Sequence, residues 1–345
     1  MTERVLSARE LNRALLARQG LLERAETSIA PMREQMAGLQ AQYAPSMYIG
    51  LWSRLAGFER DALTRALEQR DVIQATLMRS TIHLVSAADY WPLAIAVREA
   101  RRESWLRATR RELGRGELEA AAERLRDTLA GGQTLRRKES DELLGKAAAR
   151  GAGMWVDLVR APPSGTWERR RADLYALASD WIEPVDITRE DAVEHLVRRY
   201  LGGFGPATVK DVVSFTGLPA AELAPALDRL ELRRFRSTGG EELLDLPRAP
   251  LPDPDTPAPV RFIGTWDASL LVHARRTGVL PEEHRPRIFH TKAPQSFPTF
   301  LVDGAVAGTW RYERGAIDLT PFSRPDAATR RELAAEAERL AAFHA

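Results

Sequence analysis

Two glutamines one residue apart are the residues whose types and spacing most directly suggest chemistry: they occupy positions 40 and 42, within the stretch GLQAQYAP. On a helix, side chains two residues apart point about 200° apart and cannot converge on one ligand. On extended backbone they point the same way. Pro45 disfavours a helical conformation for the residue before it, so we expect the chain to leave a helix near Leu39. Gln40 and Gln42 then either hold one water molecule between their amides or cap a helix end.

Other familiar catalytic arrangements are missing from the sequence. It contains no cysteine, which excludes a thiolate nucleophile, a disulfide and a cysteine-ligated metal. It also contains no glycine-rich phosphate loop, no serine nucleophile elbow and no zincin motif. Its six histidines, at positions 83, 195, 273, 284, 290 and 344, lack the spacing of metal ligands. We therefore predict chemistry that needs neither a metal nor a cofactor.

Length and composition indicate a soluble protein of several units. The 345 residues are enough for two or three hydrophobic cores. No apolar run approaches the ~20 residues needed to cross a bilayer, and the N-terminus lacks the apolar core and cleavage site of a secretory signal. We expect a cytoplasmic monomer that does not bind membranes.

Basic residues are clustered, although the net charge is only +2. The clusters lie at residues 101–102, 110–111, 136–138, 169–171, 198–199 and 275–276. Such clusters either form a phosphate-binding face or lie on solvated helix faces. Nearly all of these residues are arginine, whose planar fork suits phosphate better than an ammonium group does.

The first third of the chain has the element order of a winged helix. Apolar spacing predicts helices over residues 7–24, 29–39 and 59–67. Residues 72–85 are rich in β-branched side chains and indicate strands, arranged as a hairpin. The order recurs less clearly in residues 111–186, where helical patterns precede two strand-like pieces around the turn Pro-Pro-Ser-Gly.

A third copy over residues 187–250 is clearer, with Thr188, Thr208 and Pro219 at the expected helix starts. Gly239 and Gly240 join two strands in a hairpin wing. A proline-rich linker follows at residues 247–259, and then β-rich sequence with a final helix from about Asp326. We predict a mainly α fold with β (α+β): winged helices at 1–110, 111–186 and 187–250, and a β-rich C-terminal region at 251–345.

Five stretches together resemble one family of enzymes. They are GLQAQ, LMRSTIHLV, GFGPATVKDVVSFTGL, SLLVHARRTGVLP and FLVDGAVAGTWR, and the sequence resembles the AlkZ/YcaQ family of winged-helix DNA glycosylases over most of its length. That resemblance implies excision of bulky N7-alkylguanines and unhooking of interstrand crosslinks in double-stranded DNA. The catalytic motif of the family is Gln, an aliphatic residue, then Gln or Asp, and it falls on Gln40, Ala41 and Gln42; alanine is a small occupant of the middle position.

Glutamine at both positions resembles the AlkZ branch, which protects producers of DNA-alkylating antibiotics from their own products. A carboxylate can accept a proton and stabilise a developing cation, whereas a neutral amide mainly orients water. N7-alkylation makes guanine cationic, so the base leaves as a neutral molecule without protonation. The resemblance thus implies that water held by Gln40 and Gln42 hydrolyses the N-glycosidic bond in a monofunctional reaction.

The candidate DNA contacts are Arg79, His83, His290 and Lys292. Arg79 is expected to contact phosphate, and His83 either approaches DNA or packs beneath the wing. By family resemblance, His290 and Lys292 lie on a hairpin that probes the duplex; the alternative is an ordinary polar loop.

Two other functions remain open. One is a winged-helix regulator that binds DNA without catalysis. The other is a protein that sequesters an alkylating drug, which would need an aromatic-lined cavity. The eight tryptophans are scattered along the sequence, and we expect most of them in the core.

Overall fold

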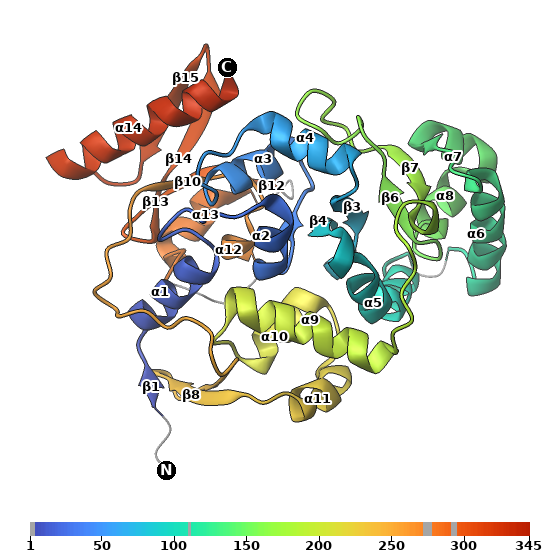
Figure 1. The fold of residues 1–345 in the computed structure, drawn as a ribbon, viewed down its shortest axis with the longest axis horizontal. Helices are drawn as coiled ribbons and strands as arrows, with labels where there is room; N and C mark the ends of the chain where they lie inside the picture. The colour runs from blue at the N-terminus through green and yellow to red at the C-terminus, as the bar shows by residue number, and fades with distance from the viewer. Residues whose placement is uncertain (1–3, 110–111, 272–277, 291–294) are drawn as a thin grey trace.

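Helices and strands alternate along the chain, and the computed structural model describes them for residues 4–109, 112–271, 278–290 and 295–345. Figure 1 shows α2, α3, β3 and β4 near the centre, β1 at the lower left beside β8, the β-rich C-terminal region at the upper left and the helices α6 to α8 on the right. The helices α9 to α11 lie below. The predicted α+β class is confirmed.

The N-terminal segment contains the helices and strands that carry the glutamine motif. Its elements are β1 (Val5–Leu6), α1 (Ala8–Arg18), α2 (Ile29–Gln35), β2 (Leu39–Gln40), α3 (Ala44–Trp52), α4 (Arg60–Glu68), β3 (Val72–Thr76), the 3₁₀ turn η1 (Met78–Ser80), β4 (Ile82–Ser86) and α5 (Ala87–Ala108). The predicted hairpin is the antiparallel pair β3–β4. Helices α3 and α5 were not expected.

The expectation that Pro45 keeps the preceding residue out of a helix was wrong. Pro45 lies in the first turn of α3, which begins at Ala44. A proline is tolerated there because the first amide groups of a helix have no intrahelical partner. All nine residues of α3 are buried, so the helix carries no polar face that periodicity could reveal.

The second segment joins its strands to those of the first. It contains α6 (Arg115–Leu129), β5 (Leu135–Arg136), α7 (Arg137–Leu144), α8 (Lys146–Ala152), β6 (Leu158–Arg160), β7 (Leu174–Leu177) and the 3₁₀ turn η2 (Ala178–Asp180). One six-stranded sheet has the order β2-β4-β3-β6-β7-β5. Ala75 on β3 pairs with Val159 on β6, so the segments predicted as the first and second winged helices share a sheet.

The third segment follows its predicted order of helices and hairpin. Its elements are α9 (Arg189–Phe204), α10 (Val209–Thr216), α11 (Ala220–Arg229), β8 (Arg233–Ser237) and β9 (Glu242–Asp245). The expected caps are confirmed, since Thr188 and Thr208 accept hydrogen bonds from the backbone amides of Asp191 and Asp211. β1 pairs in parallel with β8, which fastens the start of the chain to this segment.

The C-terminal region is an antiparallel sheet covered by a helix. It comprises β10 (Arg261–Ile263), α12 (Ala268–Leu271), the 3₁₀ turn η3 (Glu282–His284), α13 (Arg285–Ile288), β11 (Phe289–His290), β12 (Gln295–Ser296), β13 (Thr299–Val302), β14 (Ala305–Glu313), β15 (Ala316–Pro321) and α14 (Ala327–His344). The main sheet has the order β10-β13-β14-β15. Among the described residues, no helix has the length and apolar character needed to cross a membrane.

The two faces of the β3–β4 hairpin belong to different hydrophobic cores. Val85 and Ile73 pack in a core shared with α5 and the third segment, whereas Leu84 and Val72 pack in a core shared with α3 and the C-terminal region. Alternate residues of a strand point to opposite faces, so this hairpin lies between the two cores. The glutamine motif is attached to it.

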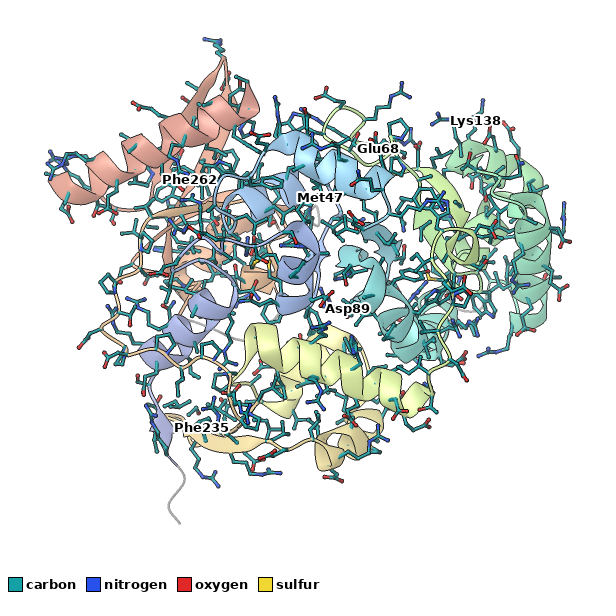
Figure 2. The ribbon with its side chains drawn as sticks, in the orientation of Figure 1. Met47, Glu68, Asp89, Lys138, Phe235 and Phe262 are labelled. Carbon is teal, nitrogen blue, oxygen red and sulfur yellow. The ribbon has the colours of Figure 1, made fainter. Side chains whose placement is uncertain are left out.

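Hydrogen bonds and ion pairs around the buried carboxylate of Asp89 connect the segments. Asp89 on α5 is 2% exposed and accepts hydrogen bonds from His195 and Arg199 of α9, while Arg199 also pairs with Glu34 of α2. Figure 2 shows Asp89 where α2, α5 and α9 approach one another. These bonds fix the third segment against the helix that precedes the motif.

Candidate active site

The first glutamine of the motif lies at a strand edge. β2 contains only Leu39 and Gln40 and pairs antiparallel with β4, so that Gln40 is opposite His83. Ala41 continues the pairing, because its amide donates to the carbonyl of Ile82 at 2.7 Å. The strand ends at Gln40, and Gln42 and Tyr43 lie in a bend before α3, so the predicted convergence of the two side chains stays a prediction.

Gln40 is largely buried and is held by an arginine. Its side chain is 7% exposed, and its Oε1 accepts a hydrogen bond from Nη2 of Arg79 at 3.3 Å. Arg79 has a φ of 54° in the turn η1, and its Nη1 donates to the carbonyl of Phe215 in α10. The guanidinium therefore connects the motif to the third segment, a link that the sequence analysis missed.

Gln42 is exposed, and its side-chain oxygen is held by one hydrogen bond. Its Oε1 accepts a hydrogen bond from the backbone amide of Ile82 at 3.2 Å. The neighbouring helix α3 has Tyr43 as its N-cap residue and shows no side-chain cap bond. The alternative that the two amides cap a helix end is therefore wrong, since both are attached to the β3–β4 hairpin region instead.

Both glutamines contact β4 at adjacent residues. The backbone of Gln40 pairs with His83, and the side chain of Gln42 accepts from the amide of Ile82. In each amide the oxygen takes a protein donor and keeps a second lone pair, and an amide nitrogen has two N–H groups. Each amide therefore keeps groups that can donate to and accept from a water molecule; that one water bridges both is a prediction. Neither amide can act as a proton acceptor of useful strength at neutral pH.

His83 lies in the interior. Its ring is 2% exposed and its Nδ1 donates to the carbonyl of Thr81 at 3.0 Å. Burial, and then the charge of Arg79, lower the pKa of His83 to about 3. The ring is neutral at pH 7 and does not offer its edge to solvent, so the structure favours the packing role over a DNA contact.

Arg79 was expected to lie at the surface and contact phosphate, but its side chain is bonded within the protein. It is partly buried, with bonds to Gln40 and Phe215, and burial lowers its pKa to about 10. It remains charged at pH 7. Because a guanidinium has five N–H donors, these bonds leave room for a phosphate contact, which stays a prediction.

The predicted hairpin contacts are only partly within the described structure. His290 belongs to β11, which pairs antiparallel with β12 through Phe289–Ser296 and His290–Gln295. Lys292 lies outside the described residues. In the part of the chain that the structure describes, no group of three or more His, Asp or Glu side chains is placed to hold a metal ion.

Aromatic residues from distant segments meet beside the motif. Tyr43, Trp167, Trp310 and Tyr312 line a cavity of about 310 Å³. Both tryptophans are buried, as expected, at 7% and 5% exposure. Their convergence was not predicted, because more than a hundred residues separate Tyr43 from Trp167 and Trp167 from the Trp310–Tyr312 pair.

Comparison with known proteins decides the family. The family described as "DNA glycosylase AlkZ-like" matches residues 34–343, which include both glutamines. The chain belongs to this DNA glycosylase family. The expected resemblance is thereby confirmed.

Similarity to one AlkZ-like protein extends over nearly the whole chain. A curated Streptomyces sahachiroi protein named interstrand DNA cross-link repair glycosylase is 22% identical over 342 residues, covering 89% of this chain and 88% of its own length. The solved structure of the S. sahachiroi DNA glycosylase AlkZ matches with a TM-score of 0.80 and 20% identity, covering 98% of this chain and 97% of that one. At that identity the structural match establishes the shared AlkZ-like fold.

Proposed function

We propose that this glycosylase hydrolyses the N-glycosidic bond of bulky N7-alkylguanines in double-stranded DNA and unhooks interstrand crosslinks formed through such bonds. The observation that carries the proposal is the pair Gln40 and Gln42, attached to one strand with both amide oxygens oriented by protein donors. Crosslink repair is also the activity in the name of the S. sahachiroi relative. A role in self-resistance to a DNA-alkylating natural product is consistent with the second glutamine.

The proposed reaction uses the positive charge of the damaged base. The oxygen of the water held by Gln40 and Gln42 bonds to the sugar C1′, and the C1′–N9 bond breaks. Its electron pair moves to N9 and neutralises the alkylated guanine, while the water loses a proton to solvent. Two neutral amides suffice because the leaving group needs no protonation, and positioning the water supplies their contribution. The product strand keeps an intact abasic site, as in a monofunctional reaction.

The alternative of a winged-helix regulator without catalysis is not favoured by the family assignment, although helices α9 to α11 and the β8–β9 hairpin have the order of a DNA-binding winged helix. The experiment that separates the two is incubation of alkylated duplex DNA with the protein, followed by chromatography of the supernatant. Release of free alkylguanine with an unbroken abasic strand supports the glycosylase. Tight binding without base release would support the regulator.

Chelators should leave the reaction intact. The proposed mechanism draws its activation from the cationic base and its nucleophile from water on two amides, so EDTA is expected to change the single-turnover rate by less than about twofold, a small effect on the barrier. The measurement is excision of N7-methylguanine with and without EDTA. Loss of activity that a divalent ion restores would require a different means of activating water.

Replacing Arg79 should slow excision and weaken salt-dependent binding together. Arg79→Ala removes the donor that orients Gln40, so we expect the single-turnover rate to fall by about tenfold. If Arg79 also contacts a phosphate, the slope of log K against log salt should decrease by about one. A matched control is Arg115→Ala, an exposed arginine on α6 that lies away from the motif. Slower excision with an unchanged slope would leave Arg79 as a positioning residue only.

A further inference from the structure

A second cavity, of about 100 Å³, lies between the first and second segments, and neither glutamine lines it. Its walls come from the end of β3, from the helices α5 to α8 and from the strands β5 to β7. Figure 1 shows α6 to α8 on the right of the molecule, with α5 below β6. The volume is several times the ~10–15 Å³ that one water molecule needs and less than the ~300 Å³ of the smallest drug-sized pockets. The cavity therefore has room for a small polyatomic ion.

Positive charge is in excess around this cavity. The described residues that line it include four arginines, at positions 101, 137, 150 and 160. Asp157 is the one acidic residue among the described lining residues, and it pairs with Arg98 at 2.9 Å. Arg137 pairs with Asp141 of its own helix, also at 2.9 Å. Within the described part of the chain, the other three arginines form no ion pair with a carboxylate.

Two of these three arginines are buried and have only neutral partners among the described residues. Arg101 on α5 is 7% exposed and Arg160 on β6 is 8% exposed. Nη2 of Arg101 donates to the sulfur of Met154 at 3.7 Å, and Nη2 of Arg160 donates to the hydroxyl of Thr76 at 2.8 Å. The Nε groups of both arginines are buried, and no acceptor for them is present among the described residues. Each side chain therefore keeps an unused donor and an uncompensated charge beside the cavity.

An anion in the cavity would satisfy both requirements. A buried guanidinium without an opposite charge is strongly destabilising, and native proteins leave few buried donors without an acceptor. Burial is the main cause that lowers the pKa of Arg101 to about 10, and the nearby charge of Arg160 also lowers it. Arg101 thus remains charged at pH 7. One ion placed between Arg101 and Arg160 would compensate both charges and accept from both Nε groups.

The lining groups favour a tetrahedral oxyanion over a simple halide. Guanidinium groups bind phosphate oxygens through paired N–H donors. The cavity is also lined by Ser140 and Tyr175, whose hydroxyl groups can donate further hydrogen bonds. Several donors from different elements match an ion with four oxygens, and an excess of positive charge matches a divalent one.

We propose that this cavity is a phosphate-binding site in which Arg101 and Arg160 contact the bound group. The phosphate comes either from free solution or from a DNA strand. Because Arg101 lies on α5 and Arg160 lies on β6, the bound group connects the first segment to the second. The site is separate from Gln40 and Gln42, and it does not depend on the reaction proposed for them.

Calorimetric titration of the full chain with inorganic phosphate, at constant ionic strength in chloride, tests the site. We expect saturable binding and a melting temperature about 2–4 °C higher in saturating phosphate. Arg101→Met and Arg160→Met should each weaken the binding by about 10- to 100-fold, since each removes charged hydrogen bonds. The matched control is Arg107→Met, which removes an exposed arginine from the same helix and does not line the cavity. It should keep the wild-type affinity.

Two results would overturn the proposal. The first is a wild type that binds no phosphate and melts at the same temperature with and without it, because water then fills the cavity. The second is binding that both methionine variants retain, because the ion then binds elsewhere. If the variants do not fold, crystals of the wild type soaked in sulfate decide instead. Density for the ion between the two guanidinium groups supports the site, and water alone at that position refutes it.

Competition with duplex DNA identifies the source of the phosphate. If a DNA phosphate occupies the cavity, free phosphate at constant ionic strength should displace an undamaged duplex, and Arg101→Met should weaken duplex binding. If the ligand is free phosphate, neither change should alter the affinity for the duplex. Either pattern, together with the calorimetric result, supports a phosphate site and names its source.

Discussion

Gln42→Ala should reduce single-turnover excision by about ten- to a thousandfold with little change in melting temperature. The side chain is exposed, and its one protein bond comes from the amide of Ile82, so its removal costs at most about 1 kcal/mol of stability. The melting temperature and DNA affinity of the variant provide the control. A loss of rate confined to the chemical step is the signature of a group that positions water.

Substitution of Gln40 should affect stability as well as rate, because Gln40 is buried. Gln40→Ala should slow excision by a similar factor, but it also leaves Nη2 of Arg79 without its acceptor, which adds an expected cost of about 1–3 kcal/mol. The double variant with Gln42→Ala should be less than additive in rate, since one water depends on both amides. Gln42→Asp should remain active because a carboxylate also accepts a bond from water. Full activity in the double alanine variant would move the active site elsewhere.

Asp267→Asn should produce the largest loss of stability. Asp267 is 4% exposed and binds both terminal nitrogens of Arg54, at 2.8 and 2.9 Å. Arg33, also fully buried, has Nε and Nη1 without partners, and burial followed by the charge of Arg54 lowers its pKa to about 9. Removing the carboxylate charge leaves two arginines in the interior uncompensated. We expect a cost of about 3–5 kcal/mol in the free energy of unfolding.

The matched control is Asp318→Asn. The Asp318 carboxylate pairs with Arg311 at the surface, and its loss should cost less than about 1 kcal/mol. Denaturant unfolding of both variants at pH 7 measures the two costs, and equal costs would contradict the prediction. Adding Arg33→Met to Asp267→Asn should restore part of the lost stability, because it removes one unpaired charge.

The contribution of Asp267 to stability should depend on pH. Burial opposes ionisation of Asp267, but the charge of Arg54 and the bonds from Arg54 and Ser269 lower its pKa overall. The stability it contributes is therefore present at neutral pH and is lost as pH falls below about 4.

Local sequence signals were sufficient to predict the helices of the third segment, but not the buried helices α3 and α5. Thr188, Thr208 and Pro219 sit at helix starts where their chemistry is recognisable from neighbours in sequence. α5 begins with a comparable signal, since Ser86 accepts from the amide of Asp89, and that spacing could have revealed it. Residues 89–94 are buried in succession, so the amphipathic period that normally identifies a helix is hidden.

The two glutamines were predicted from their spacing and from family resemblance, and their catalytic role stays a prediction. Their surroundings could not be predicted from the sequence. Arg79 bonds both to Gln40 and to Phe215 of α10, which lies over a hundred residues further along the chain. Long-range packing of this kind leaves no local pattern in the sequence. The aromatic cavity was not predicted for the same reason, because distant segments form its walls.

The shared sheet sets an order of events during synthesis. Until β6 emerges, β3 has β4 on one side and an unpaired edge on the other, and an unpaired edge invites pairing with other chains. A chain that stops near residue 110 would carry that edge permanently. Fragments cut at this boundary should therefore precipitate. Residues 111–186 supplied as a separate chain would cover this edge only, because the two faces of the hairpin also need the third segment and the C-terminal region.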